Sequence, residues 1–538
     1  MQGHLNAPEG RCHCAVSRLR MVTCLILALL FACAKSYTEY MTFVFSLEFV
    51  LECVTATALF LGMFCLLDWV ADGNAFLPGF MRRIVHWGQS PSGTLAETLR
   101  VAVLLLACWL PYLLWMYPGN LSNDTTGQLS MFYTIMGHGD YWMTAQHPVF
   151  DTLVFGAITY PFYAAGHFRV GVFVCILLQE IATAISMGFV FARCRGRWHL
   201  SEGLYGACLM LVALCPVYPL IACSLSKDTF FSWVYILWLV LTLDCVLDGD
   251  GSVWRCVAMT GLGALMCLTK KFGFYVVALS AAVMAVALAG RVVQGKRKQI
   301  FGAFVCVFCV ALLTNFVAVP AINRTTHASP SLSTDVLIVP IQQLAMTYSK
   351  YPEEFQGNSL ETLQTYVNTE AIDGGRWDPT IADSIKVNRD DSLHVKSFME
   401  LWLKTGLRHP NSYVDGWAAL EAPLFTYGGI VPLYDSVWHT WARADVIPDQ
   451  LFEKGKPFAR ATVSIESWYQ WLSEVPILDV FLMQAFYVLL LPMYLLSVLL
   501  SKEGRGLRSA FMPVLVSFLG LLVSPLVTPN EETTRYLM

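Results

Sequence analysis

Charged side chains are scarce in this sequence. Only 14% of its 538 residues are charged, whereas soluble domains carry about 25%. The net charge is -4, so the chain has no excess of positive charge with which to bind nucleic acid. Hydrophobic residues make up 56% of the chain and gather in blocks of about 20, the length that crosses a hydrocarbon core. The composition therefore predicts a polytopic membrane protein that does not bind nucleic acid.

Cysteine is absent from the long polar stretch that follows Pro320, although the chain has 17 cysteines. Most cysteines, such as Cys267, lie inside apolar blocks, where cysteine acts as a small hydrophobic residue. Cys12 and Cys14 stand close together, but no second ligand pair follows at the spacing of a zinc site. We therefore expect neither a disulfide framework nor a metal cluster.

Eleven apolar blocks are predicted to cross the membrane. They occupy residues 21–34, 42–67, 99–116, 170–192, 204–223, 230–247, 254–269, 272–289, 300–319, 476–500 and 511–527. The second block follows the first almost at once, so we interpret the first as an anchor and not as a cleaved signal. The predicted fold class is an all-α polytopic membrane protein with about eleven transmembrane helices.

Clusters of Lys and Arg give the predicted sidedness, because cytoplasmic loops collect positive charge. The clusters are Arg11 with Arg18 and Arg20, Arg82 with Arg83, Arg193 with Arg195 and Arg197, Arg291 with Lys296, Arg297 and Lys298, and Lys502 with Arg505 and Arg508. All five fall on one side only if the apolar stretch 150–165, which is short and contains Pro161, does not cross. We predict a helix in the outer interface there, with its tyrosines at headgroup depth. The N-terminus is then cytoplasmic.

The predicted organisation has four parts along the chain. They are two N-terminal transmembrane helices with a cytoplasmic loop (1–98), a transmembrane core with a first outer loop and the interfacial helix (99–320, with 117–149 and 150–165), a mainly helical extracytoplasmic domain (321–475), and the C-terminal transmembrane helices (476–538). The final residues, Glu-Glu-Thr-Thr-Arg-Tyr-Leu-Met, look like the start of another span, as in a truncated chain.

Two polar residues bracket the first outer loop. Asp124 follows the helix-breaking Pro118 and Gly119, and His147 closes the loop before Pro148. A carboxylate and an imidazole at a membrane surface suit acid–base work on a lipid-bound substrate. The structural alternatives are that Asp124 is the N-cap of the following helix, the commoner role of a lone Asp after a turn, and that His147 is a fixed residue before proline.

Three lysines lie on the side that should have few positive charges. Lys227, followed by Asp228, occupies one predicted outer turn, and Lys270 with Lys271 occupies the next. Snorkelling to lipid phosphates is one explanation. The other is a substrate phosphate, whose developing charge as it leaves needs a cation. Arg535, near the last outer turn, would add a bidentate contact to the same group.

The insert carries an aromatic and polar stretch formed by Trp417, Glu421, Tyr427 and Tyr434. Such residues suit a sugar site, because rings stack on sugar C–H faces. Loop aromatics near a bilayer more often anchor to headgroups, so both explanations stay open.

Several of these pieces, in this order, resemble the GT-C superfamily of integral membrane glycosyltransferases, and within it a group of largely uncharacterised bacterial multi-span proteins. The matching pieces are Tyr117 to Gly119, Ser122 to Asp124, Gln128, His147-Pro148, Lys227-Asp228, Pro340 to Gln343, Trp377 to Lys386, His409-Pro410 with Tyr413, and Arg535-Tyr536. The resemblance runs from about Leu99 to the end of the chain.

The resemblance implies inverting transfer of a sugar from a polyprenyl-phosphate donor on the outer leaflet. It also implies an acidic residue of the first outer loop at the catalytic centre, which here is Asp124. Many members have a second acidic residue beside the first, whereas this chain has Asn123, so dependence on Mg²⁺ or Mn²⁺ is left open, with Asp124 as the ligand if there is one. Lys270 and Lys271 stand where relatives tend to have Arg and Asn.

The hypothesis for function is a glycosyltransferase of the bacterial plasma membrane, acting on a cell-envelope glycan, lipid or protein acceptor. Asp124 and His147 are the predicted catalytic residues. The predicted substrate-binding residues are Gln128, Lys227, Asp228, Lys270, Lys271, Gln342, Gln343 and Arg535. The alternatives are a non-catalytic membrane assembly or polymer-binding protein, a transporter, and another lipid-dependent transferase such as an acyltransferase. A transporter is disfavoured because few charges lie inside the spans.

Overall fold

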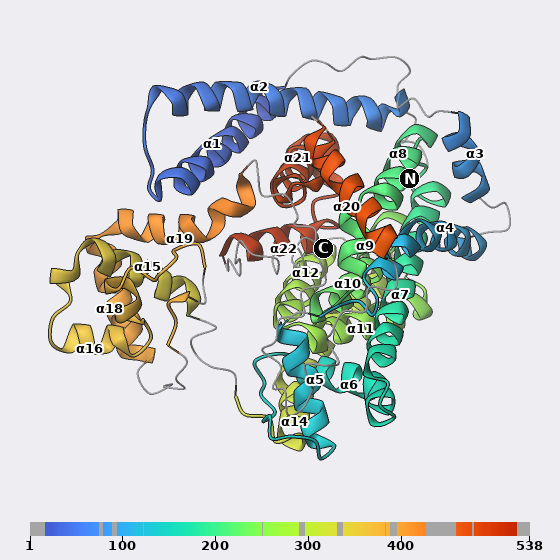
Figure 1. Cartoon of the computed structure of the whole chain (residues 1–538). Coiled ribbons are helices and arrows are strands. Elements are labelled where there is room, and N and C mark those ends of the chain that lie inside the picture. Colours follow the sequence, from blue (N-terminus) through green and yellow to red (C-terminus); the bar gives the residue numbers. More distant parts are fainter. Residues whose placement is uncertain are drawn as a thin grey trace.

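Helices make up nearly all of the regular structure of this protein (Figure 1). The computed structural model describes residues 17–74, 79–88, 94–121, 123–249, 251–289, 296–330, 337–381, 384–387, 395–426, 459–475 and 478–523. Two strands of two residues each complete the regular structure of these ranges.

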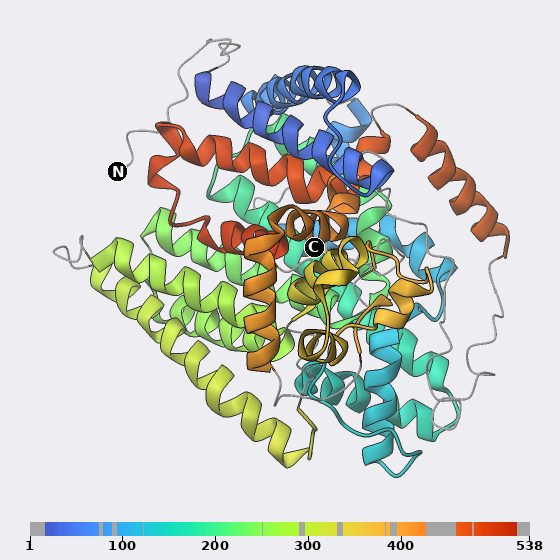
Figure 2. The same ribbon diagram turned by 90° about the vertical axis from the view of Figure 1, so that its left-hand side faces the viewer.

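Seven helical segments of the described residues are long and apolar enough to cross a membrane. They are α1 (Arg18–Tyr40), α2 (Leu47–Trp69), α4 (Thr94–Trp115), α7 (Phe168–Gly196), α10 (Lys227–Asp248), α12 (Lys271–Ala289), and α13 (Lys296–Leu313), which continues through a π-helical turn (Thr314–Ala318) into α14 (Val319–Thr325). The predicted class of an all-α, multi-span membrane protein is confirmed at this level. Figure 2 shows α12 and α13 running side by side with the helix that precedes them, α11 (Val253–Thr269).

Four of the eleven expected spans correspond to shorter apolar helices. These are α8 (Glu202–Leu214), α11, α21 (Leu491–Leu500) and α22 (Met512–Val523). The expected span 204–223 is interrupted at Cys215 and Pro216, after which the short helix α9 (Val217–Ala222) begins. Pro216 has no N–H to donate to the helix that precedes it, so the chain breaks there. The count of eleven stays a prediction.

Ion pairs mark one end of the helical bundle. Arg193 Nε lies 3.2 Å from Asp244 Oδ2, and Arg195 Nη1 lies 3.5 Å from Glu97 Oε2. These contacts join the end of α7 to the end of α10 and to the first turn of α4. Lys227 begins α10, so it lies at the opposite end of the same helix. The basic residues at the end of α7 and this lysine are thus separated by about the length of α10, and the predicted sidedness stays a prediction.

Three shorter elements cluster at that opposite end, at the bottom of Figure 1: α5 (Asn123–Ile135), α6 (Val149–Ala164) and α14. The loop between α5 and α6 is tied to the chain that leaves α14, because Ala145 N donates to Ser329 O (2.8 Å). The apolar helix α6 packs on the start of α7, where a Cβ added at Gly171 would lie 2.8 Å from Cβ of Phe162. α6 is shorter than the seven candidate spans, and its predicted interfacial position stays a prediction.

A separate group of helices, at the left of Figure 1, follows α14 in the chain. It contains α15 (Ile338–Lys350), α16 (Asn358–Gln364), α17 (Thr369–Asp373), α18 (Val395–Arg408) and α19 (Pro410–Phe425). Ile341, Tyr366 and Phe398 are among its buried core residues. The helix of the preceding span runs on to Thr325, past the boundary expected at 321. The extracytoplasmic insert and its limits stay a prediction.

The helical group is anchored to the first helix of the protein. Tyr37 of α1 donates from Oη to Asp415 Oδ1 of α19 (2.7 Å), and Lys350 of α15 pairs with the other oxygen of Asp415. On the other side of the protein, α20 (Ala459–Glu474) packs on α4, with Trp468 Nε1 donating to Tyr112 Oη (3.1 Å). The amphipathic helix α3 (Gly79–Gly88) precedes α4.

Candidate functional site

A pair of very short strands brings the first outer loop to a distant part of the chain. β1 (Asn120–Leu121) runs parallel to β2 (Ser224–Leu225), with Asn120 opposite Ser224. β1 leads into α5, and β2 leads into α10. Thr125 reinforces the pairing, because its Oγ1 donates to Leu225 O (2.6 Å). The amino ends of α5 and α10 therefore lie side by side.

The approach to β1 requires glycine. Gly119 has φ of +119°, and a Cβ there would lie 1.9 Å from Cδ1 of Ile176 on α7. The positive φ favours glycine, and a larger residue would also displace the end of the Ile176 side chain. α7 also fixes β2, since Gln179 Nε2 donates to Ser224 O (2.8 Å). The glycine of the Pro-Gly motif thus provides the backbone conformation that leads into β1.

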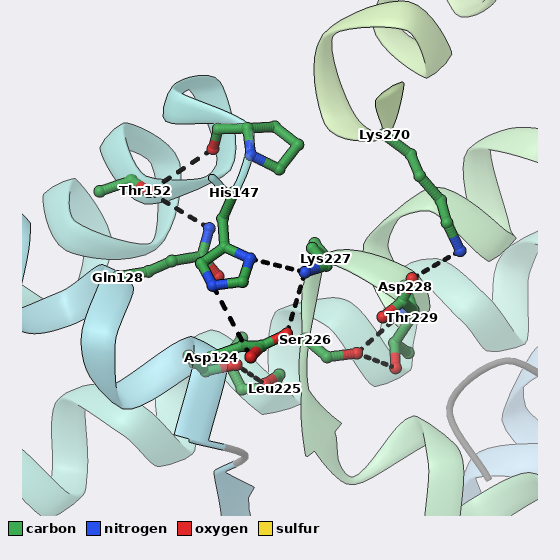
Figure 3. Close-up of polar contacts among 12 residues, drawn as sticks. Asp124, Gln128, His147, Thr152, Leu225, Ser226, Lys227, Asp228, Thr229 and Lys270 are labelled. Carbon is green, nitrogen blue, oxygen red and sulfur yellow. Dashed lines mark hydrogen bonds and ion pairs between the residues drawn. The ribbon is translucent and has the colours of Figure 1, made fainter. Parts of the chain in front are cut away.

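Lys227 joins the two predicted catalytic residues (Figure 3). Its Nζ donates to Asp124 Oδ2 (2.9 Å) and lies 2.7 Å from Nδ1 of His147. The other ring nitrogen of His147, Nε2, lies 3.6 Å from Asp124 Oδ1. The three side chains are 15%, 23% and 13% exposed for Lys227, Asp124 and His147, so the cluster is reachable from solvent. Residues from three separate parts of the chain converge at this point.

Asp124 lies at the start of α5. The helix begins at Asn123, so Asp124 is in the first turn. A carboxylate in this turn is favoured by the helix dipole. Its side chain is directed to Lys227 of another helix. The structure therefore places Asp124 in the cluster, where acid–base chemistry is available to it.

A second lysine–carboxylate pair adjoins the first. Lys270 Nζ, at the turn between α11 and α12, donates to Asp228 Oδ1 (2.6 Å). The side chain of Asp228 is only 1% exposed. The ammoniums of Lys227 and Lys270 thus both bind carboxylates of the protein. Lys271 is exposed at the start of α12.

The surroundings of these pairs suit an anion. Two helix amino ends, of 13 and 22 residues, meet there, and each carries partial positive charge and N–H groups without partners in their own helix. Lys227 and Lys270 add two full positive charges. A phosphate is the common ligand of such an arrangement.

Whether this point takes a divalent cation is decided by few protein ligands. Among the described residues, no group of three or more His, Cys, Asp and Glu side chains could hold a metal. Asp124 and His147 offer two donors, and the ammonium of Lys227 already contacts both. Mg²⁺ is commonly held by one or two carboxylates together with substrate phosphate and water, so the dependence on Mg²⁺ or Mn²⁺ stays a prediction, with Asp124 as the protein ligand.

Comparison with known proteins gives one assignment. The model of a family of unknown function (DUF6020) matches residues 135–528. The chain belongs to this family. The DUF6020 match includes His147, Lys227 and Lys270, whereas Asp124 precedes it. No curated protein and no solved structure matches the chain significantly, so the resemblance to the GT-C superfamily stays a prediction.

Other predicted substrate-binding residues of this DUF6020 protein are engaged elsewhere. Gln128 is fully buried, and its Nε2 donates to Thr152 Oγ1 (3.2 Å), so it joins α5 to α6 beside the cluster. Gln342 and Gln343 lie in α15, where their amides donate to the carbonyls of Pro379 (3.3 Å) and Tyr413 (3.1 Å). These two glutamines connect elements of the helical group and are not part of the Lys227 cluster. Their roles in binding stay predictions.

Two further predictions fall where the structure gives no description. Arg535, proposed as a second phosphate contact, and the aromatic residues Tyr427 and Tyr434 lie outside the described residues. Glu421, from the same stretch as these tyrosines, is buried in α19 at 1% exposure. Trp417 lies on the same helix and packs against the cluster of apolar side chains from α1, α19 and the helices around residue 488.

The sequence interpretation missed Asp151. This residue lies in the first turn of α6, is 0% exposed, and has no hydrogen-bond partner for either carboxylate oxygen among the described residues. Burial raises the pKa of Asp151 well above its ordinary value, and Lys227 and Lys270 oppose this shift. The sequence contains a signal for this residue: Asp151 is the one ionisable side chain between residues 149 and 159, and a carboxylate in a mainly apolar membrane helix is costly and often functional.

Proposed function

We propose that this DUF6020 protein is a membrane-embedded glycosyltransferase. It moves a sugar from a polyprenyl-phosphate donor to a hydroxyl acceptor of the cell envelope, on the extracytoplasmic side of the bacterial plasma membrane. The observation that carries the proposal is the contact of Lys227 with both Asp124 and His147, at the meeting point of two helix amino ends. A base, a cation and an anion-binding surface are thereby placed together.

The donor phosphate is bound by the cationic side of the cluster. Lys227, Lys270 and the N–H groups at the start of α10 attract its oxygens. The phosphate competes with Asp124 for Lys227, because both are anions within reach of one ammonium. Binding of the donor therefore loosens the Asp124–Lys227 pair and makes the carboxylate available to the acceptor. The pair represents the resting form of the site.

In the transfer step, Asp124 accepts the proton of the acceptor hydroxyl. The acceptor oxygen forms a bond to the anomeric carbon from the face opposite the phosphate, and the bond between that carbon and the phosphate oxygen breaks with inversion. The electron pair remains on the polyprenyl phosphate, where Lys227 and Lys270 stabilise the added negative charge. A phosphate is a weak base and leaves without a proton, so one carboxylate suffices, unlike the two of glycoside hydrolases. His147 orients Asp124 and Lys227 through its two ring nitrogens.

The test is transfer of a labelled sugar from a set of polyprenyl-phosphate sugars by the full chain in bilayers. We expect Asp124→Asn to lower kcat by about 10²- to 10⁴-fold, the range for loss of a general base. Asp140→Asn is the matched control, since Asp140 is an exposed carboxylate of the same loop. It should behave as wild type.

The other outcomes of this assay separate the alternatives. Equal transfer by wild type and Asp124→Asn would remove Asp124 from the mechanism and keep the reaction. Absence of transfer from every donor, together with unchanged biological function of Asp124→Asn, would favour the non-catalytic assembly or polymer-binding protein. Movement of an unmodified substrate across the bilayer would identify a transporter, and transfer from an acyl donor would identify an acyltransferase.

A further inference from the structure

We infer that Asp151 is a positioning residue of this site: its carboxyl is held neutral beside Lys227 and Lys270, and this leaves both ammoniums able to take a substrate phosphate. The inference rests on the proposed function for the identity of the ligand. It assigns a role to a residue that acts through the two lysines and does not itself touch the reacting atoms.

The side chain of Asp151 is buried and has no contact with solvent. The side chain is 0% exposed at the start of α6, and neither oxygen accepts a hydrogen bond from a described residue. Its neighbour Thr152 binds the buried Gln128, and one turn later Phe155 packs against Phe230 at a ring separation of 6.1 Å. An ionised carboxylate in such surroundings, without a hydrogen-bond donor, loses its hydration with no replacement. The neutral acid avoids that cost.

Charged groups of neighbouring elements lie close enough to Asp151 to act on its charge. They are Lys227 and Asp228 of α10 and Lys270 of the α11–α12 turn. α5 contributes Asp124, which reaches the same cluster through Lys227. The buried ionisable side chains of α7 are Cys175 and Glu180, and Glu180 lies near Cys223. Burial outweighs the two lysines, so the pKa of Asp151 is raised.

The protonation state of Asp151 changes the net charge around Lys227 and Lys270. With Asp151 neutral, two carboxylates (Asp124 and Asp228) face two ammoniums, and the four charges cancel. An ionised Asp151 would be a third carboxylate facing the same two ammoniums, and it would compete with an incoming phosphate. Because the pKa is raised, the neutral form persists above the usual range of an aspartate. Phosphate affinity should therefore fall as the pH rises through the pKa of Asp151.

The experiment measures binding of a sugar-free polyprenyl phosphodiester to the full chain in nanodiscs, as a function of pH. A phosphodiester is the suitable probe because its single charge does not titrate near neutral pH. In wild type, we expect affinity to fall with rising pH, with a limit of about tenfold per pH unit for one proton. The near-isosteric Asp151→Asn cannot ionise and should flatten the profile. Both proteins retain His147, so the comparison reports the removal of the carboxyl of Asp151.

A second measurement needs neither a variant nor a ligand. Aspartate labelled with ¹³C at the side-chain carboxyl shifts the infrared carbonyl band of any protonated aspartate in the wild-type protein. Bands from buried glutamates such as Glu180 and Glu421 do not shift. We expect a shifted band at neutral pH that disappears in labelled Asp151→Asn and persists in labelled Asp140→Asn.

The outcomes distinguish this inference from the proposed function. A missing band, parallel pH profiles in wild type and Asp151→Asn, or no binding of the phosphodiester would each overturn the role of Asp151, whether or not sugar transfer is found. A band with a flattened profile supports it. If those two results came with no transfer from any donor, the proposed reaction would fail and the phosphate site would stand.

Discussion

The two ends of the helical bundle both carry ion pairs, but they use them differently. At the end formed by the last turns of α7 and α10, Arg193–Asp244 and Arg195–Glu97 are separate contacts, each between two helices. At the opposite end, Lys227 contacts two partners at once, and Lys270–Asp228 lies directly beside it. Separate pairs hold helices in register. Converging pairs that remain partly exposed can exchange partners with a ligand.

The first prediction concerns the end of the bundle that carries the Lys227 cluster. Lys227→Met should lower transfer by about 10³-fold, because it removes the cation that, in the proposed reaction, stabilises the leaving phosphate. Arg193→Met, at the opposite end of the bundle, removes a charge of the same sign and should leave kcat of the folded fraction within about twofold. Transfer by both variants is measured on folded protein, recovered by size exclusion. Equal losses in the two variants would contradict the distinction between the ends.

The second prediction concerns the end of the bundle that carries the Arg193–Asp244 pair. The side chain of Asp244 is 0% exposed and pairs with Arg193, so Asp244→Asn leaves an arginine without its charge partner. Loss of one partner of a buried pair costs about 3–5 kcal/mol of unfolding free energy. We expect a lower thermal midpoint of the purified protein, with kcat retained below that midpoint. A variant with an unchanged midpoint and lost transfer would show that this end also serves catalysis.

The third prediction concerns the Lys270–Asp228 pair, which we expect to contribute both to phosphate binding and to stability. Lys270→Gln should raise KM for the donor about tenfold, with a smaller effect on kcat, because we propose that Lys270 contributes to phosphate binding beside Lys227. It should also lower the thermal midpoint, since the buried Asp228 loses its ammonium. Lys271→Gln is the matched control, because Lys271 is exposed and adjacent in sequence. An effect of the same size in both variants would argue against the pairing.

The smallest expected effect is on the pH dependence of stability, and it concerns Glu421 in α19, away from both ends of the bundle. Burial raises the pKa of Glu421 to about 9, so this carboxyl is neutral in the folded protein and ionises at its ordinary value when the chain unfolds. Unfolding then releases a proton between about pH 5 and 9, and stability falls as the pH rises through this window. Glu421→Gln removes this dependence.

The thermal midpoint of Glu421→Gln should therefore approach that of wild type near pH 5 and exceed it by a growing margin toward pH 9. Unfolding scans at three pH values measure the difference. Glu400→Gln is the control, because that side chain is 71% exposed. A gap that does not change with pH would mean that Glu421 is charged in the folded state.

The sequence identifies individual residues of the candidate site, but it does not show how they are arranged in space. Asp124, His147 and Lys227 each stand out as polar groups in predicted outer turns, and the helix patterns indicate where those turns lie. Their convergence depends on two paired residues of β1 and β2, and the two contacting groups Asp124 and Lys227 are 103 residues apart. No local pattern of this length specifies such a pairing.

Two residues show why position in sequence is a poor guide to contact. Lys227 and Asp228 look like one unit, yet Lys227 binds Asp124 whereas Asp228 binds Lys270. Successive residues of a helix point about 100° apart, so the first turn of α10 serves two different neighbours. Asp151 was overlooked because its apolar surroundings indicate a membrane-surface helix, and only tertiary packing reveals that the lysines face it.

The boundary of the family match has a practical consequence for anyone dissecting this protein. A fragment that begins at residue 135 would keep the lysines and the histidine of the site, but it would lack Asp124, the whole of β1 and the hydroxyl of Tyr37 that holds Asp415. It would lose the proposed general base, nearly all of α5 with the strand that pairs it to α10, and the anchor of the helical group together. The start of the family match is therefore an unsuitable point for truncation, and a fragment that keeps all of these contacts starts before α1.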